Sequence, residues 1–379
     1  MRRSILVVVC AQVFALVVAL CHTSVASAQP APPLPALLIT TAITGLKKPW
    51  DVAQAPDGAV ITGERGGRFV VKRPDGSVEQ LAADLTDLYV EGETGLMGLT
   101  LAPDFSSTRT LLTCQGHRDA AGTDIRVVAW TVDVGWTTLT RGATVLAGIP
   151  VGPEGRHDGC RVLAAADGTL YVGTGDAASP SVPQDPNSFG GKVLHINADG
   201  SPAAGNPDPR SPVFTRGHRN PQGLAVQPGT RRIYAIEQGT DRDDEVNLLQ
   251  SGGNYGYSPD LIPFFYNETV PMTDPIRVPG AIPAVWSSGA PTLATPGGTF
   301  VAGSGWGEWE GALAIPTQQG KKMVFLKLAE DGRSVVHTAV ALENQFGRLR
   351  SATATADGSL LITTDNGKDD QVLLLTPRS

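Results

Sequence analysis

Short apolar segments recur along the chain, and each follows a turn rich in Gly, Pro or Asp. Pro56-Asp57-Gly58 precedes one such segment at residues 59–62, and a second apolar run at 68–72 follows at hairpin distance. Related turns precede further apolar runs at residues 110–113, 169–173, 232–236, 312–315 and 359–362. Six strand-turn units of this kind predict an all-β fold, a six-bladed β-propeller with four-stranded blades.

The ends and one internal stretch depart from this pattern. Residues 29–37 are rich in Pro and Ala and predict a flexible leader, so the propeller is expected to span 38–379. A strand near residues 39–44 is expected to close the ring by joining the last blade. Prolines recur between residues 263 and 291, so 267–295 is predicted to form a long loop without regular structure.

The first residues have the features of an export signal. Arg2 and Arg3 precede an apolar run at residues 5–20, and small residues at 26–28 supply a cleavage site. A membrane anchor is the alternative, but the apolar run is short for a span. We therefore predict a signal peptide at 1–28, and a mature chain without a membrane span in the periplasm or outside the cell.

The net charge of the mature chain disfavours some kinds of binding partner, and its cysteines bear on whether it contains a disulfide. Without residues 1–28 the chain has 28 Lys and Arg against 37 Asp and Glu, a net charge of −9. Such an acidic chain is a poor partner for nucleic acid or an anionic membrane surface. The mature chain keeps Cys114 and Cys160, which an oxidising compartment would pair as one disulfide; two free buried thiols are the alternative.

The stretch from Gly217 to Gly256 carries the densest set of polar candidates. Arg219, beside Asn220 and Gln222, offers planar donors for a carboxylated planar ligand. Gly239 and Thr240 form a turn followed by carboxylates, and their oxygens suit a hard cation such as calcium. A solvated polar loop is the alternative interpretation of this stretch.

Three further loops carry candidate side chains. His157 lies among short flexible residues, where it is placed to act as a general base, and a solvated loop histidine is the alternative. Glu93 is the carboxylate of a glycine-rich loop. Arg348 and Arg350 fall on one side of a strand by its alternation and could clamp carboxylates; an exposed basic strand end is the alternative.

These motifs together resemble the soluble PQQ-dependent sugar dehydrogenases, the glucose/sorbosone dehydrogenase group, in order from about Leu46 to the C-terminus. The resemblance implies a propeller that holds pyrroloquinoline quinone (PQQ) and Ca²⁺ over its axis. It implies that His157 is the catalytic base, and that the quinone is contacted by Glu93, Arg219, Asn220, Arg348 and Arg350. The carbonyls of Gly239 and Thr240 match the ligands of the cofactor's calcium. Asp244, Glu245 and Tyr255 fall where some members bind a structural calcium.

The implied reaction is oxidation of the C1 hydroxyl of aldose sugars to lactones, with electrons passed to an external acceptor other than oxygen. Two positions depart from the family pattern. Gln319 stands where the family has a cofactor-binding Lys, and Lys321 or Lys322 could replace it if the loop shifts. Cys160 stands where Gly is usual, and a bridge to Cys114 would fasten the His157 loop to the neighbouring blade.

Two other functions are alternatives to PQQ-dependent sugar oxidation. A non-catalytic propeller that binds a sugar or protein partner is supported by Gln319, whereas the retention of His157 together with Arg219 speaks against it. A calcium-dependent lactonase needs several carboxylates around an axial metal. The candidate loops are richer in Arg, Asn and Gln than in Asp and Glu, which disfavours the lactonase.

Overall fold

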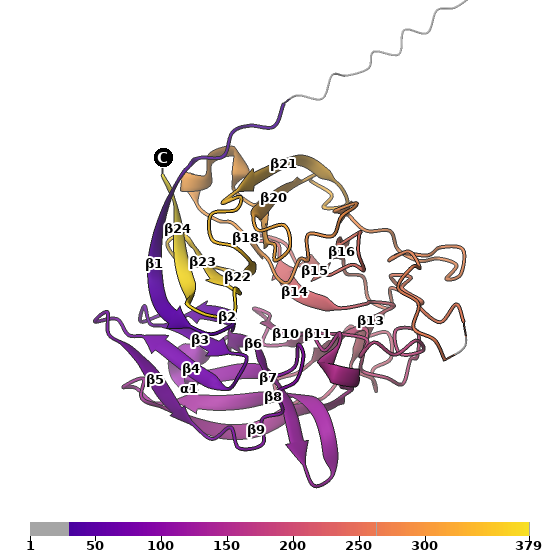
Figure 1. The fold of residues 1–379 in the computed structure, drawn as a ribbon, viewed down its shortest axis with the longest axis horizontal. Coiled ribbons are helices and arrows are strands. Elements are labelled where there is room, and N and C mark those ends of the chain that lie inside the picture. Colours follow the sequence, from indigo (N-terminus) through magenta and orange to yellow (C-terminus); the bar gives the residue numbers. More distant parts are fainter. Residues whose placement is uncertain (1–29, 263, 379) are drawn as a thin grey trace, which may run out of the picture. The chain divides into compact units, whose positions relative to one another are not determined.

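A computed structural model describes residues 30–262 and 264–378, so the predicted signal peptide lies outside the described residues. Four of its five sheets have four strands, and the fifth has eight. The eight-stranded sheet is two four-stranded units joined by a short parallel pairing of strands β5 and β9, Ala82 with Thr138 and Ala83 with Leu139. The sheets therefore form six four-stranded blades, which confirms the predicted propeller (Figure 1).

Each blade is an antiparallel sheet, and the first five run in simple chain order. Blade 1 contains β2 (Pro49–Gln54), β3 (Val60–Glu64), β4 (Arg68–Lys72) and β5 (Val78–Ala83). Blade 2 contains β6 (Leu96–Leu101), β7 (Thr110–Asp119), β8 (Gly122–Val132) and β9 (Thr138–Ile149). Blade 3 contains β10 (Cys160–Ala164), β11 (Leu170–Thr174), β12 (Lys192–Ile196) and β13 (Val213–Arg216).

The second half of the chain repeats this order. Blade 4 contains β14 (Pro221–Val226), β15 (Ile233–Glu237), β16 (Glu245–Leu248) and β17 (Trp286–Ser287). Blade 5 contains β18 (Thr299–Phe300), β19 (Leu313–Pro316), β20 (Met323–Leu328) and β21 (Val335–Ala341). Blade 6 contains β22 (Leu349–Ala354), β23 (Leu360–Thr364), β24 (Asp370–Arg378) and the N-terminal strand β1 (Ala36–Leu46). Helical structure in the described residues is limited to α1 (Phe105–Thr108) and the 3-10 helices η1 (Pro153–Gly155) and η2 (Ser304–Trp309).

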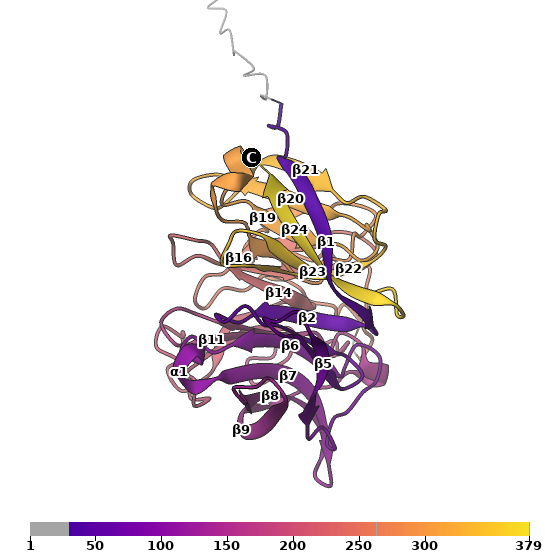
Figure 2. The same ribbon diagram turned by 90° about the vertical axis from the view of Figure 1, so that its left-hand side faces the viewer.

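Strand β1 closes the ring, as the sequence predicted. It pairs antiparallel with β24, from Ala36 opposite Arg378 to Leu46 opposite Asp370, and Figure 2 shows the two strands side by side. Because β1 begins at Ala36, the last two residues of the predicted leader belong to this strand. The last blade is thus built from both ends of the described chain, which fixes the first blade against the sixth.

The apolar runs found in the sequence occupy equivalent places in the fold. Apart from the run at 68–72, which forms β4, they fall on the second strand of all six blades, namely β3, β7, β11, β15, β19 and β23. Those strands are almost wholly buried because neighbouring blades pack their apolar faces together. Val127 of blade 2 and Val172 of blade 3, for example, belong to one buried cluster. The stacking of small sheets lets a long chain bury its core without one large globular centre.

Blade topology also decides where the loops meet. In an antiparallel sheet each strand reverses direction, so the segment that enters a blade and the connection between its second and third strands lie at the same end. The first strands β2, β6, β10, β14, β18 and β22 contact one another around the ring. All twelve of these loops therefore lie on one face around the axis.

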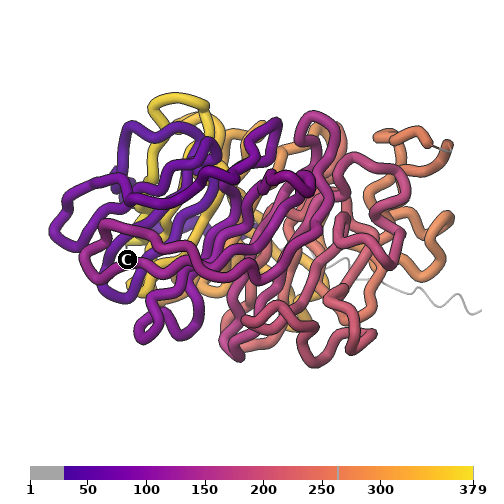
Figure 3. The backbone as a smooth tube through the Cα atoms, turned by 90° about the horizontal axis from the view of Figure 1, so that it is seen from below, coloured from indigo at the N-terminus to yellow at the C-terminus, as the bar shows by residue number. Residues whose placement is uncertain are grey.

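The connection between β16 and β17 is the main irregular segment. It runs over residues 249–285, and Figures 1 and 3 show its orange part extending from the side of the blades. The predicted loop at 267–295 therefore begins too late and includes β17, the two-residue strand that completes blade 4. A strand this short carries too little apolar pattern to be recognised in the sequence. Among the helices of the described residues, none has the length and apolar character needed to cross a bilayer.

Cys114 of β7 and Cys160 of β10 form a disulfide, with their Cα atoms 5.8 Å apart. The bridge joins blade 2 to blade 3 beside the loop that carries His157. Replacing both cysteines with Ser is expected to lower the free energy of unfolding by about 4 kcal/mol, because the bridge restricts a 46-residue separation in the unfolded chain. Denaturant unfolding with and without reductant measures this loss. Equal stability of oxidised wild type and the double variant would contradict the expectation.

Candidate active site

His157 lies in the loop that enters blade 3, and its backbone is held in an unusual conformation. Its φ angle is +54°, a region that non-glycine residues rarely adopt. A Cβ at Gly175 would collide with the His157 carbonyl oxygen, so only glycine fits opposite it. Nδ1 of His157 lies 2.9 Å from Oδ1 of Asp176, a fully buried carboxylate in the loop after β11. The surrounding loops thus fix both the backbone and the ring.

The hydrogen bonds define the tautomer of this ring. Nη2 of Arg219 lies 2.8 Å from Nε2 of His157, and a guanidinium can only donate. Nε2 therefore carries the lone pair, and Nδ1 carries the hydrogen that points to Asp176. The ring therefore has the tautomer that a general base needs, with its basic nitrogen at Nε2, where Arg219 now occupies the lone pair.

Tyr266 joins the pair from the long connection of blade 4. Its hydroxyl lies 2.6 Å from Oδ2 of Asp176 and 3.1 Å from Nδ1 of His157, and it also contacts the hydroxyl of Tyr257 at 3.0 Å. Burial, followed by the charge of Asp176, raises the pKa of Tyr266 well above its usual range. The phenol therefore stays protonated and donates to Asp176, which leaves that carboxylate satisfied on both oxygens.

A polar network connects this base to the other predicted residues. Oε2 of Glu93 accepts hydrogen bonds from Asn220 at 3.0 Å and from Gln222 at 3.2 Å. Asn220 in turn accepts from the backbone of Gly159, two residues beyond the base, at 3.1 Å. Loops that enter blades 2, 3 and 4 thus meet at one place, as the axial arrangement predicted.

Arg350 extends this network to blade 6. Its Nη1 donates to Oε1 of Gln222 at 3.2 Å, and its Nε donates to Asp365 at 3.2 Å. Arg348 approaches the same Asp365 at 3.9 Å, and the side-chain amide of Gln318 also donates to it. The two arginines therefore share one side, as strand alternation predicted, and Asp365 balances part of their charge.

Two arginines contact the ring of one buried tryptophan in this site. The guanidinium groups of Arg161 and Arg350 lie 4.6 and 4.9 Å from the ring centroid of Trp50, which is fully buried in the first strand of blade 1. Cations stack favourably on aromatic faces, and such contacts strengthen when water is excluded. Three inner strands therefore hold the arginines in place before any ligand binds.

The two glutamines in the turn after β19 differ in exposure. Gln318 is buried at the site, whereas Gln319 is exposed. Of the two proposed replacements, Lys321 is exposed and Lys322 pairs with Glu343 at 3.4 Å. Gln319 as a cofactor contact therefore stays a prediction, and Gln318 is a second amide of the same turn whose side chain reaches Asp365.

Gly239 and Thr240 lie in the turn between β15 and β16. A Cβ at Gly239 would collide with the backbone of Arg242, so this turn needs a glycine. No loop N–H in the described part of the chain donates to the carbonyl oxygen of Gly239 or Thr240. Two carbonyl oxygens without amide partners are the kind of ligand that a calcium ion accepts.

The remaining predicted metal ligands are occupied by protein contacts. Asp244 accepts hydrogen bonds from Gly239, Ser288, Thr292, Leu293 and Ala294. Tyr255 donates to the carbonyl of Leu248 at 2.6 Å, and Glu245 lies buried beside Asn247. In the described ranges no three His, Cys, Asp or Glu side chains form a group suited to a metal ion. Only the carbonyls of Gly239 and Thr240 therefore enter our calcium proposal.

Glu245 gives the folded protein a pH dependence. Burial, and then the charge of Glu237, raises its pKa from 4.5 to about 8. A raised carboxyl pKa stabilises the fold fully below about pH 4.5, and this contribution is lost as pH rises through about 8. Glu245→Gln keeps a neutral side chain at every pH, so we expect its stability to fall less than that of wild type between about pH 5 and about pH 9. Urea unfolding at both pH values tests this, with exposed Glu330→Gln as the control; parallel losses in all three proteins would contradict it.

Sequence reasoning missed several residues of this site. Asp176, Tyr266 and Asp365 all contact predicted residues, yet none was singled out. Asp176 and Asp365 follow the second strand of their blades, so knowledge of which loops share a face would have found both. Tyr266 carries no such signal, because it reaches the site through an irregular connection.

The fold and the site together define a propeller with an imidazole and a cluster of arginines on its axis. Comparison with known proteins agrees with this description. A family model described as Glucose / Sorbosone dehydrogenase matches residues 46–374, and the chain belongs to this family. Aldose sugar dehydrogenase of Escherichia coli is 27% identical over 88% of this chain and 91% of its own length. Quinoprotein glucose dehydrogenase B of Acinetobacter calcoaceticus is 30% identical over 57% of this chain and 51% of its own. The PQQ-bound aldose sugar dehydrogenase of Streptomyces coelicolor has a TM-score of 0.76 and 29% identity, covering 91% of this chain and 99% of that one.

Proposed function

We propose that this protein is an exported, PQQ-dependent aldose dehydrogenase that oxidises the C1 hydroxyl of sugars to lactones. The observation that carries the proposal is the contact between the Nε2 lone pair of His157 and the guanidinium of Arg219, beside a cluster of further arginines. Family membership supports the reaction class, and the names of the relatives support sugar as substrate and PQQ as cofactor. The predicted signal peptide supports export to the periplasm or beyond.

The residues present fit an anionic planar cofactor. Nε of Arg219 is buried and finds no hydrogen-bond partner among the described residues, which is costly unless a ligand satisfies it. Arg348 and Arg350 offer further planar donors and share only one nearby carboxylate, Asp365. We propose that these three arginines, with Asn220, hold PQQ, whose carboxylates match guanidinium forks.

Arg65 and Lys48 are proposed to supply the charge that Gln319 does not. Arg65 donates to the carbonyl of Gly92, next to Glu93, so it lies in the loops around the axis. Burial, and then the charge of Arg350, lowers the pKa of Arg65, and the charge of Arg65 in turn lowers that of Lys48. An anionic ligand bound beside these cations would offset their mutual repulsion.

Bound PQQ would supply the acceptor for the hydride that leaves C1, and calcium on the Gly239 and Thr240 carbonyls would stabilise negative charge there. The protein's own step is proton transfer: Nε2 of His157 removes the proton of the C1 hydroxyl. Asp176 holds Nδ1–H and stabilises the imidazolium that forms. Arg219 must leave Nε2 to expose its lone pair, and an anionic ligand would offer its guanidinium another partner. Turnover would also require an external acceptor for the two electrons of the oxidation.

Reconstitution tests this function. Purified protein that has been freed of metal is given PQQ and Ca²⁺, and a redox dye reports oxidation of a panel of aldoses. We expect activity that needs both additions, and a lactone product. Binding of PQQ without oxidation of any sugar would overturn the enzymatic proposal and favour a propeller that only binds its ligands.

A further inference from the structure

The long connection of blade 4 brings two side chains against His157, one at each ring nitrogen. Tyr266 lies at Nδ1, whereas Oε1 of Glu268 lies 3.7 Å from Nε2. The other oxygen of Glu268 lies 3.4 Å from Nη2 of Arg219. Arg156, adjacent to the base, also binds Glu268. The position of this carboxylate is thus set by groups that flank the basic nitrogen.

A carboxylate beside Nε2 has a consequence for substrate binding. A hydroxyl that gives its proton to Nε2 must lie within about 2.6 to 3.2 Å of it. Glu268 borders that volume, and an ionised carboxylate can only accept hydrogen bonds. In an aldose the carbon next to C1 carries a second hydroxyl, which would be near enough to donate to Glu268 when the first hydroxyl meets His157.

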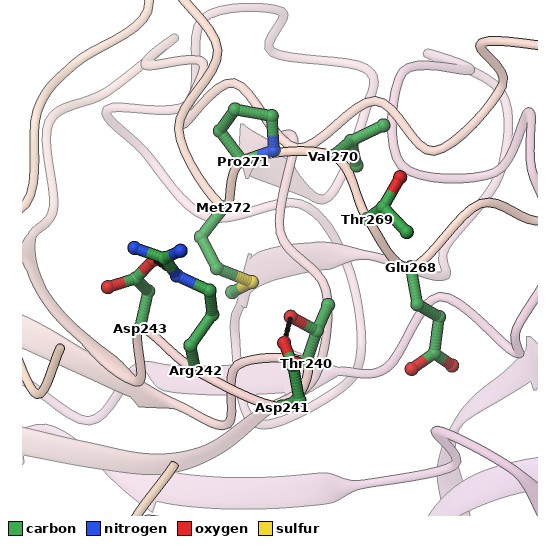
Figure 4. Close-up of a pocket in the computed structure, with 9 residues that line it drawn as sticks. All are labelled: Thr240, Asp241, Arg242, Asp243, Glu268, Thr269, Val270, Pro271 and Met272. Atoms are coloured by element: carbon green, nitrogen blue, oxygen red, sulfur yellow. Dashed lines mark hydrogen bonds and ion pairs between the residues drawn. The ribbon is translucent and has the colours of Figure 1, made fainter. Parts of the chain in front are cut away.

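The surroundings of Glu268 favour a neutral, hydroxyl-rich ligand. It borders a pocket of about 530 Å³ that Thr240, Asp241, Arg242 and Asp243 also line. Figure 4 shows Glu268 at one end, with Thr240 and Asp241 between it and the Arg242–Asp243 pair. Nε of Arg242 lies 2.6 Å from Asp243, and Glu268 is paired with Arg156 and Arg219, so the cations around this pocket are already balanced by carboxylates.

We propose that Glu268 determines substrate specificity by accepting a hydrogen bond from the hydroxyl on the carbon next to C1. The inference rests on the proposed sugar oxidation and adds which part of the sugar is recognised. It predicts that sugars lacking this hydroxyl, or carrying a carboxylate on this side, react poorly. A Glu268 that only fastens its loop to Arg156 predicts no such discrimination.

The test compares an aldohexose with its 2-deoxy analogue on the PQQ-loaded protein. For wild type we expect kcat/KM to be about 10 to 100 times higher for the aldohexose, because a hydrogen bond to a charged group is lost with the hydroxyl. In Glu268→Gln and Glu268→Ala this ratio should fall toward one, mainly through the aldohexose. Exposed Glu330→Gln serves as the control and should keep the wild-type ratio.

A second readout does not depend on turnover. A 1-deoxy sugar, which lacks the reacting hydroxyl but keeps its neighbour, should bind the loaded wild type more tightly than either Glu268 variant by calorimetry. A PQQ titration of each variant establishes that the cofactor site is intact. Equal kcat/KM for both sugars in wild type, or an unchanged ratio in a variant that binds PQQ, overturns the role of Glu268. Absence of oxidation of every sugar by PQQ-loaded wild type would instead overturn the proposed function.

Discussion

Replacing His157 with Gln is expected to lower kcat for aldose oxidation by about 10²- to 10⁴-fold, the usual contribution of a general base. Glutamine occupies a similar volume and can donate to Asp176, but it has no basic nitrogen to receive the substrate proton. The expected loss falls on kcat, because the proposed PQQ contacts are made by other residues. Stopped-flow measurement of the reductive step, with saturating PQQ and Ca²⁺, isolates this effect.

Two controls make the His157 result interpretable. His337→Gln removes an imidazole from β21, far along the chain from the site loops, and should leave kcat unchanged. A PQQ titration of His157→Gln should give an affinity near that of wild type. A His157→Gln protein that binds PQQ and oxidises aldose at the wild-type rate would remove the imidazole from the mechanism.

Replacing Arg350 with Gln is expected to weaken PQQ binding by about 10- to 100-fold, because each hydrogen bond to a charged group contributes about 1.5 to 3 kcal/mol. Arg350 stacks on Trp50 and contacts Gln222, so its fork is already oriented when the ligand arrives. Lysine would keep the charge but lose the fork and the stacking. Arg350→Lys should therefore bind PQQ with an affinity between those of wild type and Arg350→Gln.

The matched control for Arg350 is Arg73, whose guanidinium pairs with Glu79 at 2.8 Å and lies in the turn between β4 and β5. Arg73→Gln should leave PQQ affinity unchanged. Thermal unfolding of all three variants separates loss of a ligand contact from loss of the fold. Unaltered PQQ affinity in folded Arg350→Gln would contradict the assignment of this arginine to the cofactor.

Much of the architecture was predictable because propeller blades repeat. One strand of each blade carries a turn and an apolar run in the same order, and those runs proved to be the second strands of all six blades. The ring closure by β1 also followed from an extra strand at the start. The two-residue strand β17 could not be predicted, since its pairing with β16 is imposed by the surrounding blades and not by its own sequence.

Residues of the site could be predicted where they belong to a sequence motif. They could not be predicted where only the fold brings them into contact with that motif. Arg219 and His157 lie in recognisable loops, and the structure places them 2.8 Å apart. Gln319 stays a prediction: the turn exposes its side chain and buries that of Gln318, a difference that two adjacent glutamines do not reveal in the sequence. Glu268 lies in a proline-rich connection without periodicity, and only its three-dimensional course shows that it reaches the base.

Anaerobic titration of the PQQ- and Ca²⁺-loaded protein with an aldose tests the proposed sugar oxidation at the bound quinone itself. We expect the absorbance of the bound quinone to change to that of the reduced form after one equivalent of sugar per chain, and to return when an electron acceptor is added. Tightly bound PQQ whose absorbance is unaffected by any aldose would contradict it.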